Sequence, residues 1–199
     1  MTKVRRTQAE RRQQSEQGLL IAAADVILEH GYTGATFDRI SERAGYSRGL
    51  VTLRFGSKDG LVAAMIEFLG AQLEEIYRQR LETARSGREK MLDFVDVFIE
   101  RLDEDRLTRA YFVLLAGAVG NLLPQSRYFL DQHEAVKVLL ADLIREGMAD
   151  GTIAPGIDPV VAATALGCFQ LGVAIQHQLD PAMSLPDMRD FVRRFARRP

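Results

Sequence analysis

Cationic side chains gather in the short segment 45–61, which reads GYSRGLVTLRFGSKDGL. Arg48 and Arg54 lie in a predicted helix of about two turns, and Lys58 follows that helix. Arginine binds guanine edges and phosphates, and a hydroxyl such as that of Thr52 bonds phosphates or base edges. A helix this short is not stable alone, so neighbouring helices must hold it. These residue types predict contact with a polyanion such as duplex DNA.

The two faces of this predicted helix differ in chemistry. Val51 and Phe55 form an inward pair four residues apart, which suits a buried supporting face. Leucine on the outward face suits thymine methyl groups, and Gly49 lets the backbone approach DNA closely. Lys58 and the free N–H groups at the start of the next helix can bind a phosphate together. The outward face consists of Gly49, Leu50 and Leu53, flanked by Arg48, Thr52 and Arg54.

Two preceding helices must position the short one. The first is predicted over about 11–30, and Gly31 sits where a left-handed C-terminal cap belongs. The second begins after Thr36, a favourable N-cap, and ends at Gly45. Ser47 then caps the short helix. Two helices joined by so short a turn match a helix-turn-helix, whose second helix enters the major groove.

Helical apolar spacing continues along the rest of the chain, so we predict an all-α fold of about nine helices. A fourth helix of about 25 residues is predicted, capped by Ser57 and ending near Thr83. At ~38 Å it would link the helix-turn-helix segment, which we call the head, to the remaining helices, which we call the body. The run 110–120 is apolar all round, which is typical of a buried central helix. Further helices are predicted around 91–102, from about Arg127 to Asp150, from Asp158 to Leu179 and from Ser184 to about Arg197.

Composition and charge restrict the class of protein. Hydrophobic residues make up 47% and charged residues 27% of the 199 residues, as in ordinary globular proteins. Residues 1–58 carry ten basic and six acidic side chains, a net +4, whereas the remainder carries 16 and 21, a net −5. A basic head on an acidic body favours a polyanion-binding head, although an unevenly charged solvated surface would give the same count.

The sequence also bears on the cellular compartment. No signal peptide is evident, and the longest apolar run, 110–120, is far shorter than a membrane span. The single cysteine, Cys168, excludes an internal disulfide and fits a reducing compartment. We therefore expect a cytoplasmic protein with no membrane partner. The N-terminal arginines form either an arm that reaches the minor groove or a disordered solubilising tail; they are Arg5, Arg6, Arg11 and Arg12.

Residues 15–61 resemble the DNA-binding domain of the TetR family of bacterial one-component regulators. The matching pieces, in order, are EHGY at the end of the first helix, ATFDRISERAGYS, RGLV, FGSK and Leu61. The family usually has tyrosine at the position of Thr52 and often histidine at that of Arg54, which puts the docking register in question. The resemblance implies DNA contacts from Thr36, Arg39, Ser47, Arg48, Gly49, Leu50, Thr52, Leu53, Arg54 and Lys58.

A recognition helix this short makes few base contacts, so a twofold homodimer on a pseudopalindromic operator is the natural solution. The resemblance assigns dimerisation to the last two helices. Small residues there allow close helix approach, and two phenylalanines lie four residues apart on the final helix. Packing within a single chain is the alternative. The expected interface residues are Ala163, Gly167, Ala174, Phe191 and Phe195.

Large apolar residues fill the middle helices. The resemblance makes some of them the wall of an effector pocket, and the alternative is that all of them are core. Few charges interrupt these faces, so a largely apolar small-molecule effector is expected rather than a phosphorylated one. Asn121, His133 and His177 are further polar candidates for orienting the effector. The expected pocket residues are Phe94, Phe98, Tyr111, Phe112, Leu115, Phe129 and Gln170.

These features predict a DNA-binding domain with a basic arm at 1–58 and a helical effector-binding and dimerisation domain at 59–199. The expected function is transcriptional regulation, with repression released by the effector. A helical protein-interaction adaptor that keeps the fold without binding DNA is the alternative. The sequence has no GxSxG, P-loop, HExxH or dinucleotide motif, and its three histidines lack metal-ligand spacing. We therefore expect neither an enzyme nor a cofactor or metal.

Overall fold

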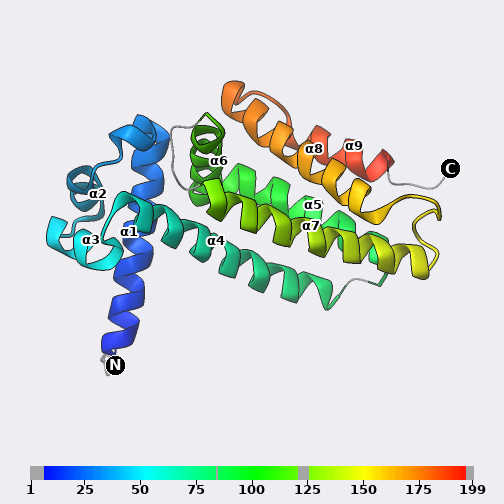
Figure 1. Cartoon of the computed structure of the whole chain (residues 1–199), viewed down its shortest axis with the longest axis horizontal. Helices are drawn as coiled ribbons and strands as arrows, with labels where there is room; N and C mark the ends of the chain where they lie inside the picture. Colours follow the sequence, from blue (N-terminus) through cyan, green and yellow to red (C-terminus); the bar gives the residue numbers. More distant parts are fainter. Residues whose placement is uncertain (1–6, 84, 121–125, 196–199) are drawn as a thin grey trace, which may run out of the picture.

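The computed structural model of the chain describes residues 7–83, 85–120 and 126–195. Regular structure within these ranges is entirely helical, which confirms the predicted all-α fold of nine helices (Figure 1). Arg5, Arg6 and Asn121, named above as candidates, lie outside the described residues. The helices are α1 (Gln8–Gly34), α2 (Phe37–Ala44), α3 (Arg48–Phe55), α4 (Lys58–Leu81), α5 (Gly87–Glu104), α6 (Arg106–Val119), α7 (Ser126–Ala149), α8 (Pro159–Leu179) and α9 (Leu185–Phe195).

Side-chain caps set the ends of the helix-turn-helix formed by α2 and α3. The Thr36 hydroxyl accepts from the backbone N–H of Arg39, and the Ser47 hydroxyl accepts from that of Leu50, as predicted. Gly45 ends α2 with a left-handed φ of 70°, which a side chain would disfavour. Because each of these helices has only eight residues, packing onto other helices must supply their stability.

The first helix begins earlier than predicted. The Thr7 hydroxyl accepts from the N–H of Glu10, and the Glu10 carboxylate accepts from the N–H of Thr7, which is a capping box. This polar signal lies ahead of the apolar pattern on which the prediction of a start near Arg11 rested. The far end agrees with the prediction, because Gly31 has a φ of 68° and regular helix stops at His30.

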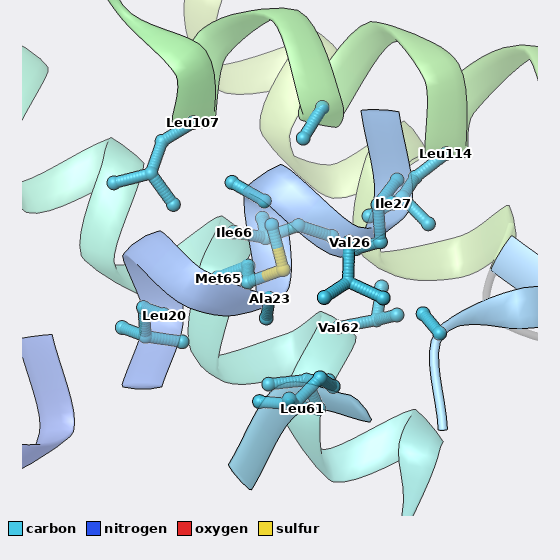
Figure 2. Close-up of a cluster of buried hydrophobic side chains, with 14 of the residues drawn as sticks. Leu20, Ala23, Val26, Ile27, Leu61, Val62, Met65, Ile66, Leu107 and Leu114 are labelled. Atoms are coloured by element: carbon cyan, nitrogen blue, oxygen red, sulfur yellow. The ribbon is translucent and has the colours of Figure 1, made fainter. Parts of the chain in front are cut away.

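The first hydrophobic core forms where α1, α4 and α6 meet. Ile40 of α2 and Val51 of α3 are fully buried in the same core, so the helix-turn-helix is anchored on α1 and α4. Figure 2 shows the centre of this cluster, with side chains from the three long helices pointing toward one another. The labelled residues are Leu20, Ala23, Val26 and Ile27 of α1, Leu61, Val62, Met65 and Ile66 of α4, and Leu107 and Leu114 of α6.

The second core joins α5, α7, α8 and α9 to the far end of α4. Helices α5 and α7 lie side by side, and α8 and α9 lie along them (Figure 1). Leu102 and Leu140 are fully buried at its centre. Arg193 of α9 pairs with the buried carboxylate of Asp96 on α5, its Nε donating over 3.1 Å, so α9 is fixed to the body by charge as well as by apolar contact.

Helices α4 and α6 belong to both parts of the molecule. The first half of α4 packs in the first core, whereas Tyr77 near its end is buried in the second. Phe112 of α6 packs against both cores. A division of the chain at residues 58 and 59 therefore cuts through a shared core, and the two-domain description remains a prediction. Any movement of α4 or α6 would therefore change the packing of both hydrophobic cores.

Candidate DNA-binding face and ligand cavity

The side of α3 that faces away from the first core is open to solvent. Val51 and Phe55 point inward and are buried, as predicted. Leu53 lies on the other side with 77% of its surface exposed, so it contributes no packing to this chain. An exposed leucine between hydrogen-bonding neighbours suits contact with thymine methyl groups. The exposed residues of this face are Arg48, Gly49, Thr52 and Leu53.

Polar residues beside α3 make contacts that leave them available at the surface. Nε of Arg48 lies 3.4 Å from Oδ1 of Asp38, and both side chains are 67% exposed. An ion pair this exposed contributes little stability, so a phosphate can replace Asp38 at low cost. Nη1 of Arg39 donates to the last carbonyl of α1 over 2.9 Å. Thr36 and Ser47 use their hydroxyl oxygens as helix caps, and their backbones start α2 and α3.

Lys58 forms hydrogen bonds within the chain that its position in the sequence does not indicate. Its Nζ donates to the carbonyls of Tyr32 and Thr33, each over 2.9 Å, and lies 4.8 Å from the centre of the Tyr32 ring. These carbonyls follow Gly31, beyond the regular part of α1, and the Tyr32 ring adds a cation–π contact. Burial lowers the pKa of Lys58 below the ordinary lysine value. Lys58 thus ties α4 to α1, and only its third N–H remains for the predicted phosphate contact.

Two other predicted DNA contacts are also turned toward the protein. Nη2 of Arg54 donates to the hydroxyl of Ser15 on α1 over 3.3 Å, and its buried Nε has no hydrogen-bond partner among the described residues. Leu50 is partly buried against the first core. The helical wheel places both on the outward face or its edge, whereas in the structure Arg54 turns toward α1 and Leu50 packs on the first core. Their DNA contacts remain predictions that require these side chains to move.

A cavity of about 360 Å³ lies between α4, α5, α6, α7 and α8. Its volume is in the range of small-molecule sites in proteins. Aromatic rings form much of its wall: Tyr77 stacks on Phe94 with ring centres 4.5 Å apart, and Phe98 meets Phe112 edge-on at 5.9 Å. Solvent-exposed Leu130 of α7 also lines the cavity and marks its approach to the surface. The arrangement can enclose a mostly apolar molecule.

Most of the predicted pocket residues reach this cavity. Leu115 and Phe129 do not, because both are buried in the first core on the side toward α1. Their assignment to the pocket is therefore corrected: they support its wall from behind, with the ring of Phe129 centred 5.2 Å from that of Tyr111. The predicted residues that line the cavity are Phe94, Phe98, Tyr111, Phe112 and Gln170.

The small residues of α8 lie on the inner side of that helix. Ala163 and Gly167 line the cavity, and a β-carbon at Gly167 would meet no other atom within 4 Å. Ala174 is fully buried in the second core. A fully buried side chain has no surface to offer a second copy of the chain. The prediction that Ala163 and Ala174 form a dimer interface is therefore corrected, and Ala163 and Gly167 leave room for the cavity instead.

The outer side of α8 and the adjacent face of α9 are apolar and exposed. Phe191 and Phe195, predicted as interface residues, are 57% and 83% exposed, and their rings stack at 5.9 Å. Phe169 of α8 stacks on Phe191 at 6.4 Å, which joins the two helices into one surface. We call this surface the α8–α9 face. Its exposed apolar residues are Val160, Val161, Leu179, Phe191 and Phe195.

The charged groups of the cavity wall are already paired with one another. Arg101 donates to Oδ2 of Asp105 over 2.6 Å and to Oε1 of Gln72 over 2.7 Å. Nζ of Lys137 lies 2.5 Å from Oε2 of Glu134. The wall therefore carries no cation that lacks a carboxylate partner among the residues the structure describes.

Two titratable rings at the cavity are kept neutral by their surroundings. Burial raises the pKa of Tyr111 well above its ordinary value. Partial desolvation lowers the pKa of His133, whose ring centre is 6.3 Å from that of Tyr111. His177 of α8, the other histidine considered as a polar candidate, does not line the cavity. Across the described ranges, no group of three or more His, Cys, Asp and Glu side chains is placed to hold a metal ion.

The N-terminal region is similar in sequence to known transcriptional regulators. Residues 19–65 match a model described as bacterial regulatory proteins, tetR family. The HTH-type transcriptional activator FasR of Mycolicibacterium smegmatis is 34% identical over 87 residues, 44% of this chain and 40% of that protein. The HTH-type transcriptional regulator CymR of Pseudomonas putida is 35% identical over 104 residues, 52% of this chain and 48% of that protein. The matches thus span less than half the length of these relatives.

A solved structure is similar over nearly the whole chain. The fatty acid degradation regulator FadR from Bacillus halodurans superposes with a TM-score of 0.77 over 90% of this chain and 96% of that chain. Its sequence identity of 19% supports a shared fold and no more. The family model covers residues 19–65, which include the helix-turn-helix, whereas the fold match covers 90% of the chain.

Proposed function

We propose that this chain is a member of the TetR family of bacterial regulatory proteins, whose model its residues 19–65 match, and that it is a sequence-specific DNA-binding transcriptional regulator. We propose further that it acts as a repressor, released from its operator when a small and largely apolar effector occupies the cavity. The cytoplasm is the compartment in which such a protein would meet both DNA and effector.

The exposed face of α3 is the observation that carries this proposal. A capped eight-residue helix is held by buried Val51 and Phe55 and presents Arg48, Thr52 and the exposed Leu53. This combination of guanidinium, hydroxyl and methyl groups matches the chemistry of base edges in the major groove. A single exposed leucine is ordinary on a protein surface, so the proposal depends on the combination of Leu53 with the exposed Arg48 and Thr52 on one face of a capped helix.

A homodimer is the proposed assembly, with the α8–α9 face as its interface. Among the described helices, α8 is long and apolar enough to cross a membrane, and only 22% of its most apolar stretch is buried in the chain. The run 110–120, considered above as the longest apolar run, is therefore not the most span-like segment. A second copy covering the α8–α9 face would bury Phe191 and Phe195 and place two α3 helices on one pseudopalindrome.

Release from DNA is proposed to work through α4 and α6. Both helices contribute side chains to the cavity and to the first core. An effector that favours one arrangement of these helices would change the spacing of the two α3 helices in the dimer. The coupling must be reciprocal, so operator DNA should weaken effector binding by the same factor, typically worth about 1–3 kcal/mol. Equal effector affinity with and without operator would contradict this mechanism.

Selection of bound sequences from random duplexes tests the proposed function. The experiment uses the wild type and Arg48→Ala at two salt concentrations. Enrichment of an inverted repeat by the wild type, with half-sites about 34–36 Å apart, is the expected result. The Arg48→Ala variant should relax the preference at particular bases. Affinity should fall steeply with salt, because phosphate contacts release counterions.

The alternative function is a helical adaptor that binds proteins but no longer DNA. The large exposed surface of the α8–α9 face is the observation that favours it, because such a surface could accept another protein. No enriched sequence at either salt concentration would favour this adaptor over the regulator. Because the relatives are transcriptional regulators, we propose no catalytic activity for the chain.

A further inference from the structure

The cavity contains an amide group whose donor has no partner. Gln170 of α8 lines the cavity and is 7% exposed, and its buried Nε2 has no hydrogen-bond partner among the described residues. A buried donor left without a partner costs about 1–3 kcal/mol. The side chain lies one turn beyond Gly167, whose missing side chain leaves space beside it. The unpaired donor is therefore available to a molecule in the cavity.

A small rotation would bring that donor into the cavity. The last torsion of a glutamine side chain is soft, so the amide can turn without leaving a preferred rotamer. The turned Nε2 would then bond an acceptor atom of a ligand, which removes the cost of the unpaired donor. A hydroxyl or carbonyl oxygen satisfies this geometry, and a pure hydrocarbon does not.

The charges of the wall argue against an ionised ligand. Arg101 is paired with Asp105 in a contact largely shielded from solvent, and Lys137 lies beside Glu134, so a carboxylate entering the cavity would have to displace an existing partner or share a cation with it. The lowered pKa of His133 keeps that ring uncharged at neutral pH. Removing a carboxylate from water without a partner is costly, whereas a neutral oxygen needs only one donor.

We propose that the cavity binds an uncharged, mostly apolar molecule with an oxygen that accepts a hydrogen bond, and that Gln170 determines this preference by donating to that oxygen. This inference rests on the proposed function, in which the cavity is the effector site. It adds the chemical class of the effector and one residue that selects it. The aromatic wall holds the apolar part, and Gln170 fixes the position of the polar end.

Competition binding with three ligands of one chain length tests the proposal. The probe is N-phenyl-1-naphthylamine, a neutral apolar fluorophore, and the competitors are 2-undecanone, undecane and undecanoate at neutral pH. The chain has no tryptophan, so protein emission does not interfere with the probe. The variants are Gln170→Leu and Gln170→Met, which remove the donor while keeping similar bulk. Gln79→Leu removes an exposed amide of α4 that does not line the cavity and serves as control.

The informative quantity is the ratio of the undecane Kd to the 2-undecanone Kd. We expect this ratio to fall by about tenfold in Gln170→Leu, since one hydrogen bond contributes about 1–1.5 kcal/mol. Gln170→Met should behave in the same way, which covers the case in which the leucine variant fails to fold. Gln79→Leu should keep the wild-type ratio, and undecanoate should bind the wild type more weakly than 2-undecanone.

Several results would overturn the proposal. An unchanged ratio in both Gln170 variants would show that the amide does not select the ligand. Tightest binding of undecanoate would show that the site prefers an anion. Absence of probe binding would show that the cavity does not admit apolar molecules. The duplex selection described above is independent, so a regulator that binds its operator but fails these tests would lose only this inference.

Discussion

Arg106, the first residue of α6, donates from Nη1 to Oδ1 of Asp25 on α1 over 2.6 Å. The other carboxylate oxygen of Asp25 lies 3.8 Å from Nη1 of Arg43, on α2 of the helix-turn-helix. Only 14% of the Asp25 side chain is exposed, so solvent screens this contact less than a surface pair. One carboxylate thus connects the helix that lines the cavity with the helix that supports α3.

Asp25→Asn is expected to weaken the coupling between cavity and DNA. The amide cannot hold both guanidinium groups, so movement of α6 would reach α2 less directly. We expect the factor by which saturating operator changes the Kd of N-phenyl-1-naphthylamine to fall about two- to fivefold, equivalent to ~0.4–1 kcal/mol. Glu29→Gln is the matched control, because Glu29 hydrogen-bonds Arg43 and interacts with Arg106 of α6 only through a weak charge effect. Equal coupling in wild type and Asp25→Asn would rule out this role.

Leu53→Glu is expected to abolish specific DNA binding without affecting the fold. The exposed side chain packs against nothing in this chain, and a carboxylate at that position would repel phosphates. The thermal midpoint should stay near that of the wild type. Ile40→Ala is the contrasting variant, because its side chain is fully buried in the first core and its loss should cost about 2–5 kcal/mol. Electrophoretic mobility shift and thermal unfolding of both variants separate recognition from support.

Gly87→Ala is expected to destabilise the protein strongly. A β-carbon at Gly87 would lie 2.0 Å from the backbone nitrogen of Gly147, where α5 meets α7. Because backbone cannot move aside as a side chain can, we expect a loss of about 3 kcal/mol in urea unfolding. Gly49→Ala on α3 is the control, since its β-carbon would meet nothing closer than 3.9 Å. That variant should keep its stability yet bind DNA more weakly; equal stability of the two variants would contradict the packing argument.

The stability of the protein should decrease as the pH falls below neutrality, in part because of His133. Its pKa is lowered in the folded state, so below about pH 6.5 the unfolded chain binds more protons than the native one. The stabilisation is present above the unfolded pKa and is lost as pH falls toward the folded pKa. His133→Phe should therefore show a smaller drop in urea midpoint between pH 7.5 and 5.5. An equal drop in both proteins would assign the effect to other groups.

Local chemistry was sufficient to predict the helix-turn-helix, because its ends depend on single residues. Ser47 and Gly45 act through their own hydroxyl and backbone freedom, and the structure reproduces both roles. The orientation of α8 could not be predicted in the same way. Apolar residues occur on all its sides, so their spacing does not tell which side faces the core. Ala163 and Ala174 were assigned outward for this reason.

The position of the cavity among the helices of the body could not be predicted from residue type either. Phe112 and Leu115 lie three residues apart on α6, yet only Phe112 reaches the cavity. Whether an apolar face is filled or hollow depends on the neighbouring helices, which the pattern of one helix does not contain. The inward orientation of Arg54 and Lys58 could not be predicted for the same reason. Their partners, Ser15 and the Tyr32 carbonyl, are distant in sequence and come within hydrogen-bond distance only in the fold.

Phe195→Glu is expected to separate the proposed homodimer into monomers. The ring is 83% exposed in the single chain and stacks on Phe191, so a charge there should leave the monomer fold intact. In a dimer that buries the α8–α9 face, the same charge would be desolvated without a partner, which costs several kcal/mol. Sedimentation velocity should show a dimer for the wild type and a monomer for the variant.

Tyr128→Glu is the matched control, because this exposed aromatic residue lies on α7 and outside the α8–α9 face. Loss of the dimer should also lower affinity for the full operator far more than affinity for a single half-site, because the two α3 helices no longer bind as one unit. A variant that remains dimeric would place the interface elsewhere. A wild type that is monomeric at micromolar concentration would leave the α8–α9 face free for another protein, as the adaptor alternative requires.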